Sequence, residues 1–133
     1  MLNIQSPFFL RRILLADAVT CVATGLLMLA GASVLEPWLG LPAALLQTAG
    51  ALLLPIAGFI MYAGTRPMLS RSMVRMIIAG NALWVAASIA LLMSGWITPT
   101  TIGQAFVVVQ AVAVAVLAEL EYIGIRRSMP VPA

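Results

Sequence analysis

The chain has 133 residues, of which 63% are hydrophobic and only 8% are charged, and its formal net charge is +3. Soluble domains are about 45–50% apolar and about 25% charged, so this composition excludes a surface that faces water on all sides. Its length is that of a single domain, covering residues 1–133. The absence of histidine and the single cysteine, Cys21, exclude histidine-based acid–base catalysis, histidine-ligated haem, cysteine-rich metal sites and internal disulfide bonds. We therefore expect no metal, no cofactor and no enzymatic activity.

Four apolar stretches predict four transmembrane helices. Each has about 20 residues, which is enough to cross a hydrocarbon core of about 30 Å. Backbone groups in lipid must be hydrogen-bonded internally, so the spans are expected to be helical, and the short connections make neighbouring helices antiparallel. The predicted fold class is an all-α, polytopic bundle of four transmembrane helices. These helices are expected at about residues 13–35, 43–65, 74–94 and 102–123.

The basic residues predict the orientation of the bundle. All seven are arginines, and all seven fall on one side of a four-span topology, whereas Glu36 falls on the other side. Basic residues stay on the cytoplasmic side, so both termini are predicted to be cytoplasmic in a bacterial inner membrane. We expect these arginines to contact lipid headgroups and not nucleic acid. They are Arg11, Arg12, Arg66, Arg71, Arg75, Arg126 and Arg127.

The first apolar stretch has an alternative interpretation. Arg11 and Arg12, the apolar run and the Ala30-Gly31-Ala32 sequence together resemble a signal peptide with an Ala-x-Ala cleavage site. However, the run is longer than a typical signal-peptide core and contains Asp17. Its removal would also leave three spans. We therefore treat it as the first transmembrane helix, with cleavage as the alternative.

An internal repeat is a further hypothesis. A shift of 64 residues superposes the first half on the second, so that Arg11 meets Arg75 and Asp17 meets Asn81. Both halves would enter the membrane from the same side, as parallel hairpin repeats related by an axis along the membrane normal. Apolar segments of low complexity also match by chance, so duplication and coincidence both stay open.

Polar residues within the spans form the candidate site, because polar groups in hydrocarbon normally face protein or a water-filled cavity. Asp17 follows Arg11 by six residues, and Asn81 follows Arg75 by six. At 1.5 Å per residue, both polar side chains lie about 9 Å deeper than these arginines. The end of the last span carries further polar groups at similar depth. The predicted intramembrane polar cluster consists of Asp17, Asn81, Gln110, Glu119, Glu121 and Tyr122.

Helical geometry predicts which of these side chains share a face of their helix. At 100° per residue, Asp17 and Cys21 share one face of the first span. Glu119 and Glu121 differ by about 160°, so one of them faces the bundle while the other reaches headgroups or a neighbouring subunit. The cluster has two interpretations: hydrogen bonds that fix helix packing, or a site for a proton, an ion or a ligand.

Pro55 lies in the middle of the second predicted span. A proline there removes one backbone hydrogen bond and predicts a kink. Gly50 and Gly58 flank it, and small residues let helices approach closely. The kink either opens a cavity or gate, or merely shapes the helix.

Three segments of the chain carry a resemblance to known proteins. They are residues 14–18 (LLADA), 80–84 (GNALW) and 119–127 (ELEYIGIRR). With them, nearly the whole chain resembles small four-span bacterial inner-membrane proteins that carry no assigned activity. The resemblance implies the fold and the location but no mechanism. The sequence has no phosphate-binding loop or nucleophile elbow that would supply one.

Two functional hypotheses follow from these patterns. The first is a non-enzymatic accessory or structural membrane protein that self-associates or binds a larger membrane complex. The alternative is a small oligomeric transporter or channel that uses the intramembrane acidic residues. A single four-helix bundle leaves little room for a pore, so transport would need several copies or a partner. In both cases the expected partners are the lipid bilayer and either further copies of the chain or a larger complex.

Overall fold

The computed structural model describes residues 7–128, and within this range the chain folds into five helices without strands. Four of them are long and apolar enough to cross a membrane. This confirms the predicted all-α class with four membrane-spanning helices. The helices are α1 (Pro7–Ala30), α2 (Ala32–Leu39), α3 (Ala43–Thr65), α4 (Arg71–Ser94) and α5 (Thr101–Ser128).

The predicted bounds of the first span, residues 13–35, are wrong at both ends. Helix α1 already begins at Pro7, where proline is favoured because the first helical N–H needs no partner. It ends at Ala30, and Gly31 separates it from the short helix α2. A side chain at Gly31 would place its Cβ 2.7 Å from the carbonyl oxygen of Leu27, so this break in the helix depends on glycine.

The observed bounds of the other spans agree more closely with the predicted ones. The bounds of α3 match the prediction, whereas α4 begins three residues earlier than predicted. Its start is capped by Ser70, whose hydroxyl accepts a hydrogen bond from the backbone N–H of Met73 at 3.3 Å. Helix α5 extends to Ser128, past the arginines that were expected to end it, because long arginine side chains can reach headgroups from within a helix.

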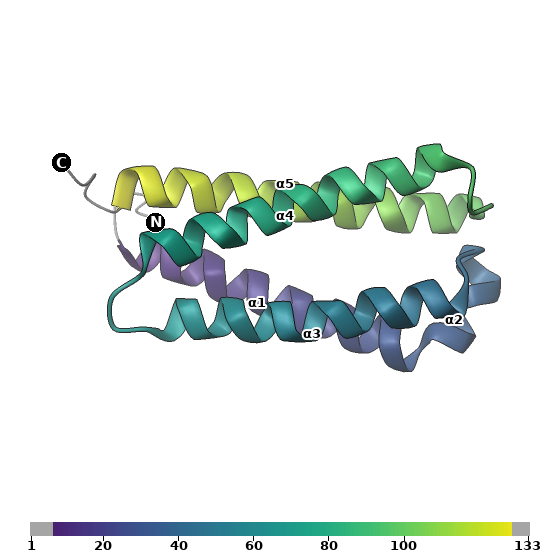
Figure 1. Ribbon diagram of the computed structural model, residues 1–133, viewed down its shortest axis with the longest axis horizontal. Helices are drawn as coiled ribbons and strands as arrows, with labels where there is room; N and C mark the ends of the chain where they lie inside the picture. Colours follow the sequence, from purple (N-terminus) through teal and green to yellow (C-terminus); the bar gives the residue numbers. More distant parts are fainter. Residues whose placement is uncertain (1–6, 129–133) are drawn as a thin grey trace.

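The helices form two hairpins, one from α1 and α3 and the other from α4 and α5 (Figure 1). Helix α1 packs closely against α3 and also against α5, whereas α3 and α4 touch at only a few points. A symmetric duplication would give the α1–α5 and α3–α4 pairs equal contact. The arrangement is therefore asymmetric, and the repeat stays a prediction.

Glycine makes the close packing of α1 against α3 possible. A Cβ at Gly50 of α3 would lie 2.7 Å from the carbonyl oxygen of Gly25 and 2.8 Å from the backbone nitrogen of Leu29 in α1. Small residues allow this approach of two helix backbones in a membrane. By contrast, Gly58 has no atom within 4 Å of such a Cβ.

The two ends of the bundle differ in character. At one end, which we name the arginine end, α1 begins, α3 meets α4 and α5 ends (Figure 1). At the opposite end, the loop end, Thr100 links the two hairpins. Its hydroxyl donates to the carbonyl oxygen of Trp38 at 2.7 Å, and its backbone N–H donates to that of Leu39 at 3.0 Å. The same hydroxyl accepts from the N–H of Gly103 at 3.0 Å and so caps the start of α5.

Candidate functional site

Asn81 joins two acidic side chains in the interior of the bundle. Its side-chain nitrogen Nδ2 donates to Oδ2 of Asp17 and to Oε1 of Glu121, each at 2.8 Å. The three residues come from α4, α1 and α5, respectively. Asp17 is only 1% exposed and Glu121 is 0% exposed. We name this group the acid–amide cluster.

The acid–amide cluster has more acceptors than donors. Oδ1 of Asp17 faces the thiol of Cys21, a weak donor, with Sγ at 3.6 Å, whereas Oε2 of Glu121 is buried and has no hydrogen-bond partner. The two carboxyl oxygens on Asn81 cannot lie farther apart than twice their 2.8 Å distance from its nitrogen. The partners found here, an amide and a thiol, carry no positive charge. Two negative charges this close in an apolar interior repel strongly, and a proton between them relieves both the repulsion and the missing hydrogen bond.

Gln110 belongs to a second network, closer to the loop end. Its side-chain oxygen accepts from Nε1 of Trp84 at 2.8 Å, and its nitrogen donates to the hydroxyl of Ser88 at 3.0 Å and to the carbonyl oxygen of Val107 at 2.9 Å. The donors of the Gln110 amide group are thus satisfied within the protein. Such a network fixes the packing of α4 against α5.

Glu119 and Tyr122 lie outside both networks, and both side chains are exposed on α5. The two glutamates of this helix therefore point in different directions, as their separation of about 160° requires. Of the six residues predicted to form one cluster, three meet at Asn81. Gln110 contributes to a separate network, and the other two are exposed on α5.

Sequence reasoning did not assign Cys21, Trp84 and Ser88 to the site. Cys21 contacts Asp17, and the other two residues hold Gln110. The available signal was helical spacing, because Cys21 follows Asp17 by one turn, and Trp84 and Ser88 follow Asn81 at helical intervals along one face of α4.

Two cavities adjoin the acid–amide cluster. The α3–α4 cavity has a volume of about 380 Å³ and includes Asn81 and Pro55 in its lining. The α1–α5 cavity has a volume of about 520 Å³ and includes Asp17. Both are mainly apolar, and both volumes are typical of sites for small molecules. The residues that line both of them are Cys21, Leu53, Trp84 and Val114.

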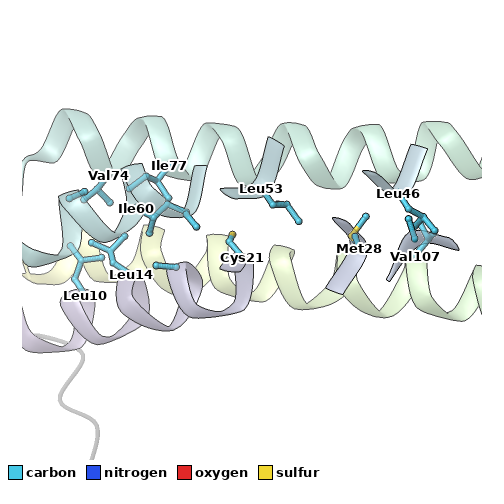
Figure 2. Close-up of a cluster of buried hydrophobic side chains, with 14 of the residues drawn as sticks. Leu10, Leu14, Cys21, Met28, Leu46, Leu53, Ile60, Val74, Ile77 and Val107 are labelled. Carbon is cyan, nitrogen blue, oxygen red and sulfur yellow. The ribbon is translucent and has the colours of Figure 1, made fainter. Parts of the chain in front are cut away.

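The α1–α5 cavity reaches the acid–amide cluster from the loop end of the bundle. The lining of the α1–α5 cavity extends from Asp17 to Leu39 and Ile102 at the loop end. Toward the arginine end, fully buried side chains close the interior, among them Leu14 and Val74. Figure 2 shows Leu14 and Val74 grouped with other buried aliphatic side chains near that end, with Cys21 farther along the bundle.

Pro55 does not interrupt α3, which is helical from Ala43 to Thr65. The proline instead contributes to the wall of the α3–α4 cavity. Its interpretation as a gate stays a prediction.

The seven arginines have different environments. The guanidinium of Arg11 donates to the carbonyl oxygens of Gly64, Arg66 and Pro67, at the end of α3. Arg66 stacks over the ring of Tyr62, 4.9 Å from its centroid. The hydrogen bonds of Arg11 hold the start of α1 to the end of α3, whereas the Arg66–Tyr62 contact lies within the end of α3. The side chains of Arg12 and Arg127 are exposed, and those of Arg71, Arg75 and Arg126 line a common cavity.

Known proteins do not identify the site. No family model, curated protein or solved structure matches this chain. Among residues 7–128, no group of three or more histidine, cysteine, aspartate or glutamate side chains is placed to hold a metal ion. The chemistry of the site must therefore be inferred from the acid–amide cluster and its cavities.

Proposed function

We propose that the protein is a small membrane carrier in which Asp17 and Glu121 hold one proton between them and exchange it for a cationic group. The observation that carries this proposal is Oε2 of Glu121, which is fully buried beside a second carboxyl group and has no partner. An aspartate and an asparagine would be enough to join two helices. A second carboxyl group adds a large desolvation cost without adding a donor, and intramembrane acids of this kind commonly mark ion or proton pathways.

The exchange conserves charge. With one shared proton, the two carboxyl groups together carry a charge of −1. When a monovalent cation binds Asp17, the O–H bond of the pair breaks, the proton leaves to water, and the sum of two carboxylates and one cation is again −1. The low-dielectric interior therefore has the same net charge before and after the exchange, which keeps the electrostatic cost of either state low.

The α1–α5 cavity indicates the class of ligand. Its lining combines Asp17 with the aromatic rings of Trp84 and Phe106 and with many aliphatic side chains. A carboxylate beside aromatic faces suits a cation, and an apolar wall suits an apolar body. The ligand class we propose is therefore a small organic cation with an apolar body, entering from the loop end.

The test measures proton release on binding of tetraphenylphosphonium, an apolar cation, to the purified protein in weakly buffered detergent solution. We expect about one proton to be released per bound cation. Glu121→Gln and Asp17→Asn should each abolish the release, because both remove an acidic proton while keeping a hydrogen-bonding side chain. Glu119→Gln is the matched control, since it makes the same chemical change on the exposed face of α5.

Each other outcome contradicts the proposal. Unchanged release in Glu121→Gln and Asp17→Asn would show that the protons come from elsewhere. If the cation binds without release of protons, the proposed exchange is wrong. If the cation does not bind at all, the proposed ligand class is wrong. If Glu119→Gln loses proton release to the same extent, the release depends on the overall negative charge of the protein and not on the acid–amide cluster.

A second candidate function is the accessory or structural subunit. It is favoured by the limited contact between α3 and α4, which leaves an apolar opening where a helix from another subunit or a second copy could pack. In that case the acid–amide cluster would join the hairpins and nothing more. Native mass spectrometry of the protein, extracted from its own membrane into nanodiscs, tests this role. A stable complex, together with acid variants that change only assembly, would favour the accessory role over the carrier.

The location that accords with both candidates is a bacterial inner membrane, with both termini and the arginine end in the cytoplasm. The support is the distribution of charge, because all seven arginines lie at one end of the bundle and Glu36 lies at the other. In this orientation, the α1–α5 cavity faces the outer side of the membrane.

A further inference from the structure

The α3–α4 cavity opens sideways, toward the part of the bundle surface that faces lipid. Helices α3 and α4 touch at only a few points and diverge toward the loop end (Figure 1). The rim of the cavity carries exposed apolar side chains, namely Ile56, Phe59 and Met76. Its inner wall is made by buried residues, among them Leu53 and Asn81. A molecule dissolved in the bilayer can therefore reach the inner wall from the side.

Asn81 presents a free hydrogen-bond acceptor at this inner wall. Both hydrogen bonds of its side chain are made by the nitrogen, Nδ2, which donates to Asp17 and Glu121. Within residues 7–128, no group donates to the side-chain oxygen, Oδ1, and this oxygen is not fully enclosed by protein. Asn81 is only 6% exposed and forms part of the wall of the α3–α4 cavity. The structure therefore directs Oδ1 into that cavity.

A free acceptor at this depth is energetically unfavourable. Asn81 is the eleventh residue of α4, about 15 Å along the helix from its start, so it lies well inside a hydrocarbon core of about 30 Å. The bilayer core supplies no water that could donate to the oxygen. The acceptor therefore keeps its desolvation penalty until a donor reaches it through the cavity.

The other polar side chains of the cavity wall already have partners. Nε1 of Trp84 donates to Gln110 at 2.8 Å, and Sγ of Cys21 lies 3.6 Å from Oδ1 of Asp17. The remaining lining consists of apolar side chains and Gly80. An ordered water needs about two to four polar partners, which this wall does not offer. A wall with one free acceptor instead suits a molecule that is apolar except for one donor.

Two aromatic rings indicate the body of this molecule. Phe59 of α3 and Trp84 of α4 both line the cavity, and aromatic rings pack favourably against one another. The volume of about 380 Å³ is sufficient for a small aromatic molecule. A lipid acyl chain would fit the apolar wall but has no donor. The backbone N–H groups of a helix from another subunit are already bonded within that helix.

We propose that the α3–α4 cavity binds a neutral aromatic molecule from the bilayer, whose single donor, such as a phenol hydroxyl, forms a hydrogen bond to Oδ1 of Asn81. This site does not rest on the carrier proposal, because its ligand is uncharged and occupies the other cavity. The two sites meet at Asn81, since the same amide group also donates to Asp17 and Glu121. Hydrogen bonds polarise one another, so the ligand also stabilises the acid–amide cluster.

The experiment follows the fluorescence of Trp84 in the full-length protein in detergent micelles. The background Trp38→Phe/Trp96→Phe removes the other two tryptophans, which are exposed and line neither cavity. Para-bromophenol has a donor, and para-bromotoluene has the same shape without one. The bromine of either probe quenches an indole ring that it contacts. At equal concentrations in the micelle, para-bromophenol should bind about fivefold to tenfold more tightly, as expected for one hydrogen bond to a desolvated acceptor.

A matched pair of glycine variants tests the location of the site. Neither Gly80 nor Gly58 has an atom within 4 Å of an added Cβ, but Gly80 lines the cavity and Gly58 does not. Gly80→Leu fills the opening and should weaken para-bromophenol binding at least about fivefold, because the ligand and the new side chain compete for one space. Gly58→Leu adds the same side chain to an exposed position of α3 and should leave binding within about twofold of the parent.

Four results would overturn the assignment. Equal affinities for the two probes would mean that no hydrogen bond to Asn81 forms, a conclusion that needs no variant of the wall. Absence of quenching by both probes would mean that an acyl chain or a helix of a second copy fills the cavity. Binding that survives Gly80→Leu, or that Gly58→Leu weakens equally, would place the ligand elsewhere.

The fourth result is proton release on binding of para-bromophenol. It would mean that the molecule acts on the acid–amide cluster and not on the free oxygen of Asn81. The carrier proposal is decided separately by tetraphenylphosphonium, so that either proposal can fail while the other stands.

Discussion

At the scale of single residues, Asn81 is the side chain on which the interior depends. Its one amide nitrogen donates a hydrogen bond to each carboxyl group of the acid–amide cluster and so connects three helices. Removing a donor from buried acceptors costs more than the hydrogen bonds themselves contribute, because the acceptors remain desolvated. The cost of losing Asn81 must therefore depend on how many carboxyl groups are left behind.

This dependence can be measured with a double-mutant cycle. Asn81→Ala should lower the free energy of unfolding by about 1–3 kcal/mol in the wild type, where two buried carboxyl groups lose their donor. In a Glu121→Leu background the same change should cost at least about 0.5 kcal/mol less, because only Asp17 is affected. Reversible unfolding in mixed micelles, followed by circular dichroism, gives both values. Equal costs in the two backgrounds would mean that Asn81 and Glu121 do not interact.

Sequence alone predicted the depth of these residues but not their meeting point. The equal spacing of Asp17 and Asn81 from arginines placed both side chains in one layer, and they do contact each other. Helical phase also showed that Glu119 and Glu121 must diverge. It could not say which of the two faces the interior, because phase gives only the angle between residues and not the direction of the neighbouring helix. That direction comes from the contact of α1 with α5.

At the scale of the helices, composition was sufficient to predict the number of spans but not the residues at which they begin and end. The run from Ile13 to Leu35 is predominantly apolar, so hydropathy predicted one helix. The helix instead breaks at Gly31, where a steric conflict with Leu27, one turn earlier, would arise for any other residue. Such conflicts are not visible in hydropathy. The same holds for Gly50, whose importance depends on a partner helix and not on its own sequence context.

The glycines of α3 provide a matched pair of substitutions. Gly50→Ala should lower the free energy of unfolding by about 1–3 kcal/mol, because the added Cβ meets the backbone of α1 and must push the helices apart. Gly58→Ala should be neutral or stabilise the protein by up to about 1 kcal/mol, since nothing lies within 4 Å and alanine favours a helix. The same unfolding assay in micelles compares them. Similar losses at both positions would contradict the close packing of α1 and α3.

At the scale of the whole molecule, the bundle is asymmetric in two directions. Across the bundle, α1 contacts α5 while α3 and α4 hardly touch, which is why the α3–α4 cavity lies beside the acid–amide cluster. Along the bundle, the arginine end is closed by buried aliphatic side chains, whereas the α1–α5 cavity reaches the loop end. Through the α1–α5 cavity, a carrier with this shape would take up its ligand from the loop end. The side to which it is open therefore depends on the orientation of the bundle in the membrane.

The orientation can be tested with two single cysteines. In a Cys21→Ser background, which keeps a donor beside Asp17, Ser72→Cys places a thiol at the arginine end and Thr98→Cys places one at the loop end. Both positions are exposed. Because arginine-rich ends stay in the cytoplasm, a membrane-impermeant maleimide added to intact bacterial cells should label Thr98→Cys and leave Ser72→Cys unlabelled.

Permeabilised cells provide the control, because both cysteines should then react to the same extent. Labelling of Ser72→Cys alone in intact cells would place the arginine end outside and would turn the α1–α5 cavity toward the cytoplasm. The proposed carrier would then take up its ligand from inside the cell. Equal labelling of both cysteines in intact cells would mean that the bundle inserts in both orientations, since each position would then face outward in half of the molecules. The arginines would in that case not determine topology, and a pair of oppositely oriented copies would become the unit to study.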